Sequence, residues 1–177
     1  MKLYYTGAAK LNAWQADINK SLGGYPSECT IPNDTLSNLL SEISEYAARQ
    51  GLVEVKAIVL KNTSGVVVNN VTLYHTYPAN CLVKLEWGVE SLNSNFKLSS
   101  ILNIRETPMG VVFSEPKTVG TKLSVVSSFP PDAMIGFWCR RTIILPNPID
   151  AITTANLEAY VTALIKTEKI SVKIDWT

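Results

Sequence analysis

The sequence has little of what catalytic and metal sites require. It contains one histidine and three cysteines, and none of them forms a C-x2-C or H-x3-H pair. Without a second histidine, a nucleophile relay or an acid–base pair would have to use carboxylates, lysine or tyrosine. Glycine-rich phosphate loops and the G-x-S-x-G elbow are absent as well. We therefore expect no enzymatic activity and no cofactor.

Charge is also scarce. Charged residues make up 18% of the chain, the net charge is +1, and no run of five like charges occurs. Such a chain has no electrostatic footprint for nucleic acid or an anionic membrane. No window approaches the ~18 apolar residues of a membrane span, and the first residues lack the apolar core of a secretory signal. We expect a soluble protein made in the cytoplasm, with neither a nucleic-acid nor a membrane partner.

The cysteines, Cys29, Cys81 and Cys139, are widely spaced. A disulfide framework normally shows an even set at shorter intervals, so we expect reduced and mostly buried thiols. Together with His75 they match a four-ligand metal site by count alone. His75 falls within the strand pattern 71–77, where a single histidine is expected to make one hydrogen bond. The sequence therefore predicts no metal site.

From residue 53 the apolar residues recur with a period of two, which indicates β-strands. Strands are expected at 53–61, 66–77, 81–89, 110–114, 122–127, 135–144 and 170–176. Turn residues separate them, including the proline-rich turns 129–132 and 145–148, and this pattern favours a sandwich over βαβ units. We predict a mostly β fold, an antiparallel β-sandwich of the jelly-roll or immunoglobulin-like type.

Two helices are expected beside the strands. Residues 34–50 carry an apolar stripe at helical spacing, which consists of Leu36, Leu39, Leu40, Ile43 and Ala47. Residues 33–35 supply N-cap side chains, and Gly51 suits the left-handed stop position. Residues 150–166 have a weaker stripe and predict a short late helix. We place the helices and the sandwich in one domain, residues 34–177.

Residues 1–33 show no sustained period and contain a turn-like Gly-Gly-Tyr-Pro segment at 23–26. They predict an extended N-terminal arm. A segment without a core of its own must rest its apolar side chains on the main domain or on another chain, and both alternatives are open. The candidate interface residues of this arm are Tyr4, Tyr5, Trp14 and Tyr25.

Arg140 and Arg141 form the one basic and aromatic cluster, beside Trp138. Adjacent strand residues point to opposite faces, so at most one arginine joins any patch. A salt bridge or an interface contact is the expected role, and both arginines are candidate interface residues. Trp87, Trp138 and Trp176 are a possible stacking platform for carbohydrate, although their alternation favours the core.

Three stretches carry a resemblance to known proteins. They are KLYYTGAAKLNAWQADINKSLGGYPS, IPNDTLSNLLSEIS and EVKAIVLKNTSGVVVNNVTLYHTYP. Their texture resembles virion structural proteins of crAss-like tailed bacteriophages, in which an arm with a GGypS turn and a helix precede a strand of the form IvLkN. The resemblance covers about residues 1–80 and, more loosely, the late strand at 134–144. One departure is Leu40, where the family pattern has phenylalanine.

The resemblance implies a β-sandwich fold and a role in assembly. We accordingly expect a subunit of a homo-oligomeric ring in the neck or tail of the virion, near the portal. Its partners would be copies of itself and the portal or neighbouring rings, reached through protein–protein contacts alone. The alternative is a capsid decoration or receptor-binding module that recognises carbohydrate.

Overall fold

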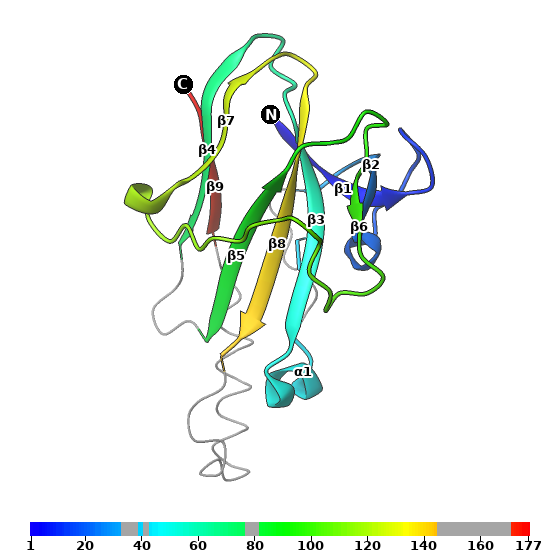
Figure 1. The fold of residues 1–177 in the computed structure, drawn as a ribbon, viewed down its shortest axis with the longest axis vertical. Helices are drawn as coiled ribbons and strands as arrows, with labels where there is room; N and C mark the ends of the chain where they lie inside the picture. Colours follow the sequence, from blue (N-terminus) through cyan, green and yellow to red (C-terminus); the bar gives the residue numbers. More distant parts are fainter. Residues whose placement is uncertain (33–38, 41–42, 77–81, 145–170) are drawn as a thin grey trace.

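The computed structural model describes residues 1–32, 39–40, 43–76, 82–144 and 171–177. These residues form a mostly β, antiparallel structure (Figure 1). The strands are β1 (Lys2–Ala8), β2 (Gly23–Thr30), β3 (Val53–Lys61), β4 (Val68–Thr76), β5 (Val83–Glu90), β6 (Leu98–Ser100), β7 (Leu123–Phe129), β8 (Met134–Ile143) and β9 (Ser171–Asp175). The helices are α1 (Glu45–Gln50) and two short 3-10 turns, η1 (Ile18–Lys20) and η2 (Val119–Thr121).

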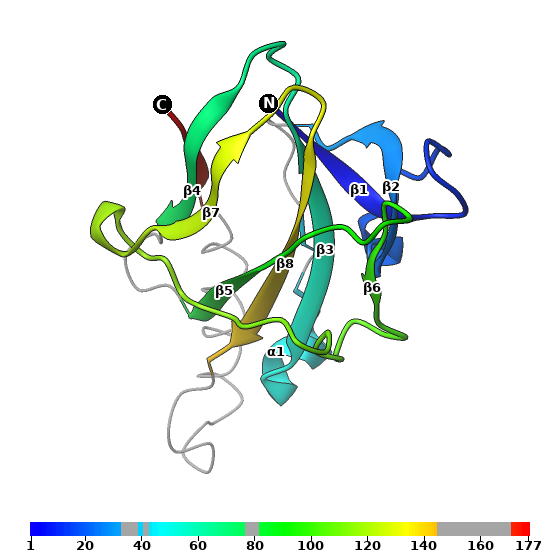
Figure 2. The same ribbon diagram turned by 45° about the horizontal axis from the view of Figure 1, so that its top comes forward.

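The strands divide into two sheets. A six-stranded sheet has the order β5-β8-β3-β1-β2-β6, and a three-stranded sheet has the order β7-β4-β9. Figure 2 shows the larger sheet curling, with the smaller sheet facing its concave side. Buried side chains of both sheets, including Leu73 and Phe129 opposite Ile58 and Phe137, belong to one apolar cluster. The structure therefore confirms the predicted antiparallel, sandwich-like β fold.

β3 and β8 form the centre of the larger sheet, where they pair over nine consecutive residues from Val53↔Thr142 to Lys61↔Met134. Because side chains alternate along a strand, β3 buries one set on each face. Ile58 and Leu60 point to the core between the sheets. Val55, Ala57 and Val59 belong to a second cluster on the opposite face. A second layer must therefore cover the outer face of this sheet.

The N-terminal segment is not the extended arm that we predicted, because its strands belong to the larger sheet. β1 pairs with both β3 and β2, and β2 pairs with β6. The Gly-Gly segment follows an extended path rather than a turn, since Gly23 and Gly24 open β2 with φ of 92° and 77°. A Cβ on Gly23 would lie 1.7 Å from the Ser99 carbonyl oxygen, so glycine permits the close approach to β6. No alternating pattern marks β1 and β2 because both are irregular in register.

Of the helix predicted at 34–50, the described residues contain α1, while residues 34–38 and 41–42 lie outside the described residues. Ser44 has extended backbone angles and its hydroxyl accepts a hydrogen bond from the Ala47 N–H, so it caps the helix there. Gly51 ends the helix in the left-handed conformation, as predicted. Leu39, Leu40 and Ile43 still pack inward, but from bent chain rather than from a helical face. The stripe therefore predicted correctly that these three side chains pack inward, whereas the described residues 39–40 and 43–44 are not helical.

The late helix predicted at 150–166 lies outside the described residues. Six of the predicted strands are confirmed as β3, β4, β5, β7, β8 and β9. The expected strand at 110–114 is reduced to one bridge between Ser114 and Trp87. Among the described residues, no helix has the length and hydropathy needed to cross a membrane.

Asn62 joins two turns at one end of the sandwich. It is fully buried, and its amide nitrogen donates to the carbonyls of Val66 and Phe129, each at 2.8 Å. We expect Asn62→Ala to lower the free energy of unfolding by about 2 kcal/mol, because the buried Phe129 carbonyl loses its side-chain donor and the part-buried Val66 carbonyl loses one of its two. Urea unfolding measures the loss, with the exposed neighbour Thr63→Ala as the control. Equal stability of the two variants would contradict this role.

Candidate functional site

The outer face of the larger sheet is covered by the chain between β6 and η2, residues 101–118, which we call the crossing loop. In both views this loop runs across β3, β8 and β5 (Figures 1 and 2). Ile101 is buried against that face, and Val111 and Phe113 pack on it. Gly88 of β5 leaves room for this packing, since a Cβ there would lie 2.3 Å from Val111 Cγ1. The crossing loop is therefore the second layer that β3 requires.

Backbone hydrogen bonds hold the crossing loop along its length. Val55 N donates to the Ile104 carbonyl at 2.6 Å, and Ile101 N donates to the Leu22 carbonyl at 3.0 Å. Trp87 and Ser114 exchange bonds of 2.7 and 2.9 Å, and His75 N donates to the Pro116 carbonyl at 2.9 Å. These bonds link the loop to both sheets. Its backbone is consequently a fixed platform for whatever side chains point outward.

Three large apolar side chains point outward from this platform. Leu102 is 90% exposed, Met109 is 93% exposed and Val112 is 84% exposed. Each follows a residue that is buried or half-buried: Ile101, Pro108 and Val111. The inward residues are explained by the core, whereas the outward three gain nothing within this chain. We call Leu102, Met109 and Val112 the outward trio, and we take the loop that carries all three as the candidate interaction surface.

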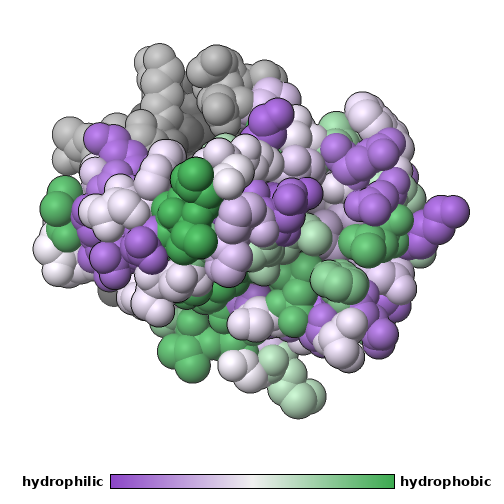
Figure 3. All heavy atoms as spheres, turned by 90° about the horizontal axis from the view of Figure 1, so that it is seen from above, coloured by the Kyte–Doolittle hydropathy of each residue, from purple (hydrophilic) through white to green (hydrophobic). Residues whose placement is uncertain are grey.

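Other exposed apolar residues lie away from the crossing loop. Figure 3 shows the face with the β3–β4 turn, where apolar atoms are interspersed with hydrophilic ones. Val66 and Val67 of that turn are 62% and 52% exposed. Isolated exposed apolar residues are normal in soluble proteins and need no function. The outward trio was not predicted from the sequence. The pair Ile101-Leu102 could have indicated it, because two adjacent apolar residues on an extended chain point to opposite sides and only one of them can pack inward.

The predicted interface residues of the N-terminal segment separate into two groups. Tyr5 is buried in the main core, and Tyr4 is half-buried beside it in β1. Tyr25 is half-buried, with the Lys97 ammonium 4.2 Å above its ring. Trp14 alone is largely exposed, at 71%. Of the two alternatives left open, packing on the chain's own domain holds for Tyr5, and only Trp14 presents its aromatic surface outward.

Arg140 and Arg141 point to opposite faces of β8, as predicted, and both form ion pairs. Arg140 Nε donates to Glu86 Oε2 at 2.9 Å, and its guanidinium lies 4.3 Å from the centre of the Phe113 ring. Burial raises the pKa of Glu86, but the hydrogen bonds from Arg140 and Lys84 outweigh this effect, and the net pKa is lowered. Arg140 therefore helps to fix the crossing loop from beneath.

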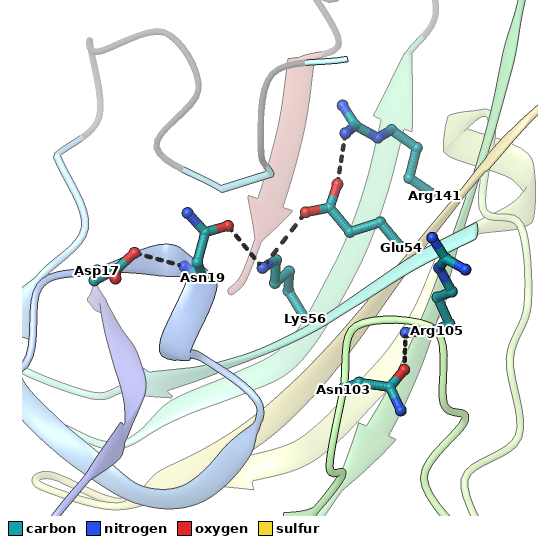
Figure 4. A network of polar contacts seen from close by, with 7 residues as sticks. All are labelled: Asp17, Asn19, Glu54, Lys56, Asn103, Arg105 and Arg141. Carbon is teal, nitrogen blue, oxygen red and sulfur yellow. Dashed lines mark hydrogen bonds and ion pairs between the residues drawn. The ribbon is translucent and has the colours of Figure 1, made fainter. Parts of the chain in front are cut away.

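Arg141 belongs to a buried charge cluster between the sheets, which we define as Glu54, Lys56 and Arg141 (Figure 4). Arg141 Nη2 donates to Glu54 Oε2, and Lys56 Nζ lies 3.4 Å from Glu54 Oε1. Lys56 Nζ also donates to Asn19 Oδ1 at 3.2 Å. Burial lowers the pKa of Lys56, and the neighbouring Glu54 carboxylate opposes that shift. The cluster joins β3, β8 and the η1 turn. Its central ammonium, on Lys56, is fully buried.

The three cysteines and His75 do not form a metal site in the described part of the chain. Cys81 lies outside the described residues, and no group of three His, Cys, Asp or Glu side chains among the remainder has metal-binding geometry. Cys29 and Cys139 are free thiols, and burial raises the pKa of Cys139. The tryptophan platform is also wrong: Trp87 and Trp138 are fully buried, and only Trp176 is exposed.

Comparison with known proteins found no matching family model, no similar curated protein and no similar solved structure.

Proposed function

We propose that this chain is a structural subunit that assembles through protein–protein contacts. The observation that carries the proposal is the outward trio, Leu102, Met109 and Val112, held on a hydrogen-bonded loop with almost full exposure. Burial of one such side chain against a partner gains about 1.5–3 kcal/mol of transfer free energy. Fixing the loop beforehand lowers the entropy that association must overcome.

The assembly that we propose is a homo-oligomeric ring in the neck or tail of a tailed-phage virion. The resemblance of residues 1–80 to crAss-like virion proteins supports this assignment. A ring arises when two different surfaces of one chain meet head to tail and the rotation closes. The receptor- or carbohydrate-binding alternative is not pursued, because two tryptophans of its platform are in the core.

The proposal includes a sandwich fold for the assembling module. The described strands divide into six and three. An immunoglobulin constant domain instead divides seven strands into four and three, and a jelly roll has eight strands in two Greek keys. Neither of these finer types, both predicted from the sequence, has support from this strand order.

Polar replacement of the outward trio tests the proposal. We expect Met109→Gln combined with Val112→Thr to weaken self-association about tenfold or more, since two apolar contacts are lost. The free energy of unfolding should change by less than about 0.5 kcal/mol, because both side chains are exposed. Sedimentation velocity over a wide range of protein concentration measures the assembly.

Val66→Thr is the matched control, because Val66 is also exposed and its hydrogen bonds are made by its backbone N–H and carbonyl. It should leave the assembly unchanged. A wild-type chain that stays monomeric at every concentration would contradict the proposal, as would equal effects of the control and the crossing-loop variant.

A further inference from the structure

Lys56 is fully buried, and its side-chain nitrogen lies between a carboxylate and a carboxamide (Figure 4). Glu54 Oε1 is 3.4 Å from Lys56 Nζ on one side. On the other side, Asn19 Oδ1 accepts a hydrogen bond from the same nitrogen at 3.2 Å. A carboxamide is an acyl group that an amine can attack, with ammonia as the leaving group. The three side chains therefore supply a nucleophile, a base and an electrophile in contact with one another.

The surroundings of Lys56 favour its nucleophilic form. An ammonium has no free electron pair, so the nitrogen must lose a proton before it can attack a carbonyl carbon. Burial has the largest effect on the pKa of Lys56 and lowers it, and the opposing effects of Glu54 and Asp17 do not cancel that shift. Glu54 faces Lys56 with Oε1, while its Oε2 is bonded to Arg141 Nη2. Glu54 is thus placed to accept protons from Nζ.

Backbone contacts hold the carboxamide beside the amine. Asn19 lies in η1, and its backbone N–H donates to Asp17 Oδ1, the cap of this turn, at 2.9 Å. At the other end of η1, the Ser21 carbonyl accepts a hydrogen bond of 2.8 Å from Ala57 N, directly after Lys56 in β3. Groups that the fold already holds together react with a smaller loss of entropy. Asn19 is exposed, which gives the departing ammonia a route to solvent.

We propose that Lys56 and Asn19 join through an amide bond between their side chains, with release of ammonia. Lys56 first loses one proton to water through Glu54. The bond between Lys56 Nζ and Asn19 Cγ then forms, and the bond between Asn19 Cγ and Nδ2 breaks. Glu54 carries a second proton from Nζ to Nδ2, so that neutral ammonia leaves and the carboxylate is regenerated. The reaction consumes no oxidant, metal or further reactant.

The bond ties η1 to β3 covalently. Because η1 connects β1 to β2, this end of the N-terminal segment then stays attached to the sheet when its hydrogen bonds open. The inference goes beyond the proposed function and does not require it, since the bond lies within one chain. The buried charge cluster, with Lys56 as an ammonium, belongs to the unlinked chain, and the freshly folded, unlinked wild type is the reference for the stability of its variants.

Intact-mass spectrometry of the full chain tests the bond, after storage in the folded state and denaturation. We expect the wild type to be lighter than its sequence mass by one ammonia molecule. A protease digest should contain a branched peptide that joins residues 19 and 56. Asn19→Ala and Lys56→Met are matched variants, because each removes one reacting group, and both should keep their full mass. Asn19 is exposed, so its substitution preserves the fold, which circular dichroism checks.

A second reaction of Asn19 also releases ammonia, namely closure of the side chain onto the backbone N–H of Lys20 to give a succinimide. That reaction does not need Lys56. Loss of ammonia that persists in Lys56→Met, without a branched peptide, therefore overturns the proposal. A wild type that keeps its full mass throughout prolonged incubation in the folded state overturns it as well. Both outcomes are independent of self-association, so they leave the ring proposal to its own test.

Discussion

Replacing Glu54 with glutamine is expected to lower the free energy of unfolding by about 3–5 kcal/mol. Glu54 is the one carboxylate of the buried charge cluster and lies between two cations, Lys56 and Arg141. All three residues are less than 10% exposed. Without the carboxylate, Lys56 loses the ion pair that opposes its desolvation, and Arg141 loses a buried charged hydrogen-bond partner.

Lys56→Met is the matched variant for this prediction. It removes a fully buried ammonium, whose pKa burial already lowers, and leaves the ion pair between Glu54 and Arg141 in place. We expect a change of about 1 kcal/mol or less, because an apolar side chain of similar length replaces a desolvated charge. Urea unfolding with a check on the m-value measures both variants. Equal losses in the two would show that packing, and not charge balance, decides the stability here.

The second large effect is acid destabilisation through His75. This side chain is fully buried on β4, and burial lowers its pKa from 6.5 to about 4. Between these two pH values the unfolded chain binds a proton that the folded chain does not, so stability falls as pH falls. The contribution is intact above pH 6.5 and is lost progressively down to pH 4, by about 3 kcal/mol in all.

His75→Gln isolates this effect, since His75 is the single histidine of the chain. Carboxylates that titrate near pH 4 affect the wild type and the variant alike. The difference in unfolding free energy between the two proteins should therefore change across the window from pH 6.5 to 4. Parallel pH profiles of the wild type and the variant would rule out His75 as the cause.

The sequence predicted strands where the apolar pattern was uninterrupted. β3 and β8 alternate clearly or are continuously apolar, and both were predicted to within a few residues. β1 and β2 escaped prediction because register shifts and Gly7, Gly23 and Gly24, all with positive φ, interrupt their pattern. Within 34–50, Leu39, Leu40 and Ile43 are not helical but pack inward, because apolar spacing of 3 and 4 is also satisfied by bent chain.

The candidate site was less predictable than the fold. The opposite directions of Arg140 and Arg141 followed from strand geometry, but their partners Glu86 and Glu54 come from other strands. Tyr5 and Trp14 were equally plausible interface residues by composition, yet one is 6% exposed and the other 71%. The outward trio had no distinguishing residue type, since its leucine, methionine and valine are typical of a core.

The sequence by itself determined that the chain is mostly β, where six of its strands lie, and which chemistry its residue types do not favour. Those properties depend on local periodicity and on residue inventory. Only the tertiary structure decided that the first 32 residues complete a sheet and that a loop forms the second layer of that sheet. These are properties of long-range pairing, and the pairing partner of a strand is not written in the strand's own alternation.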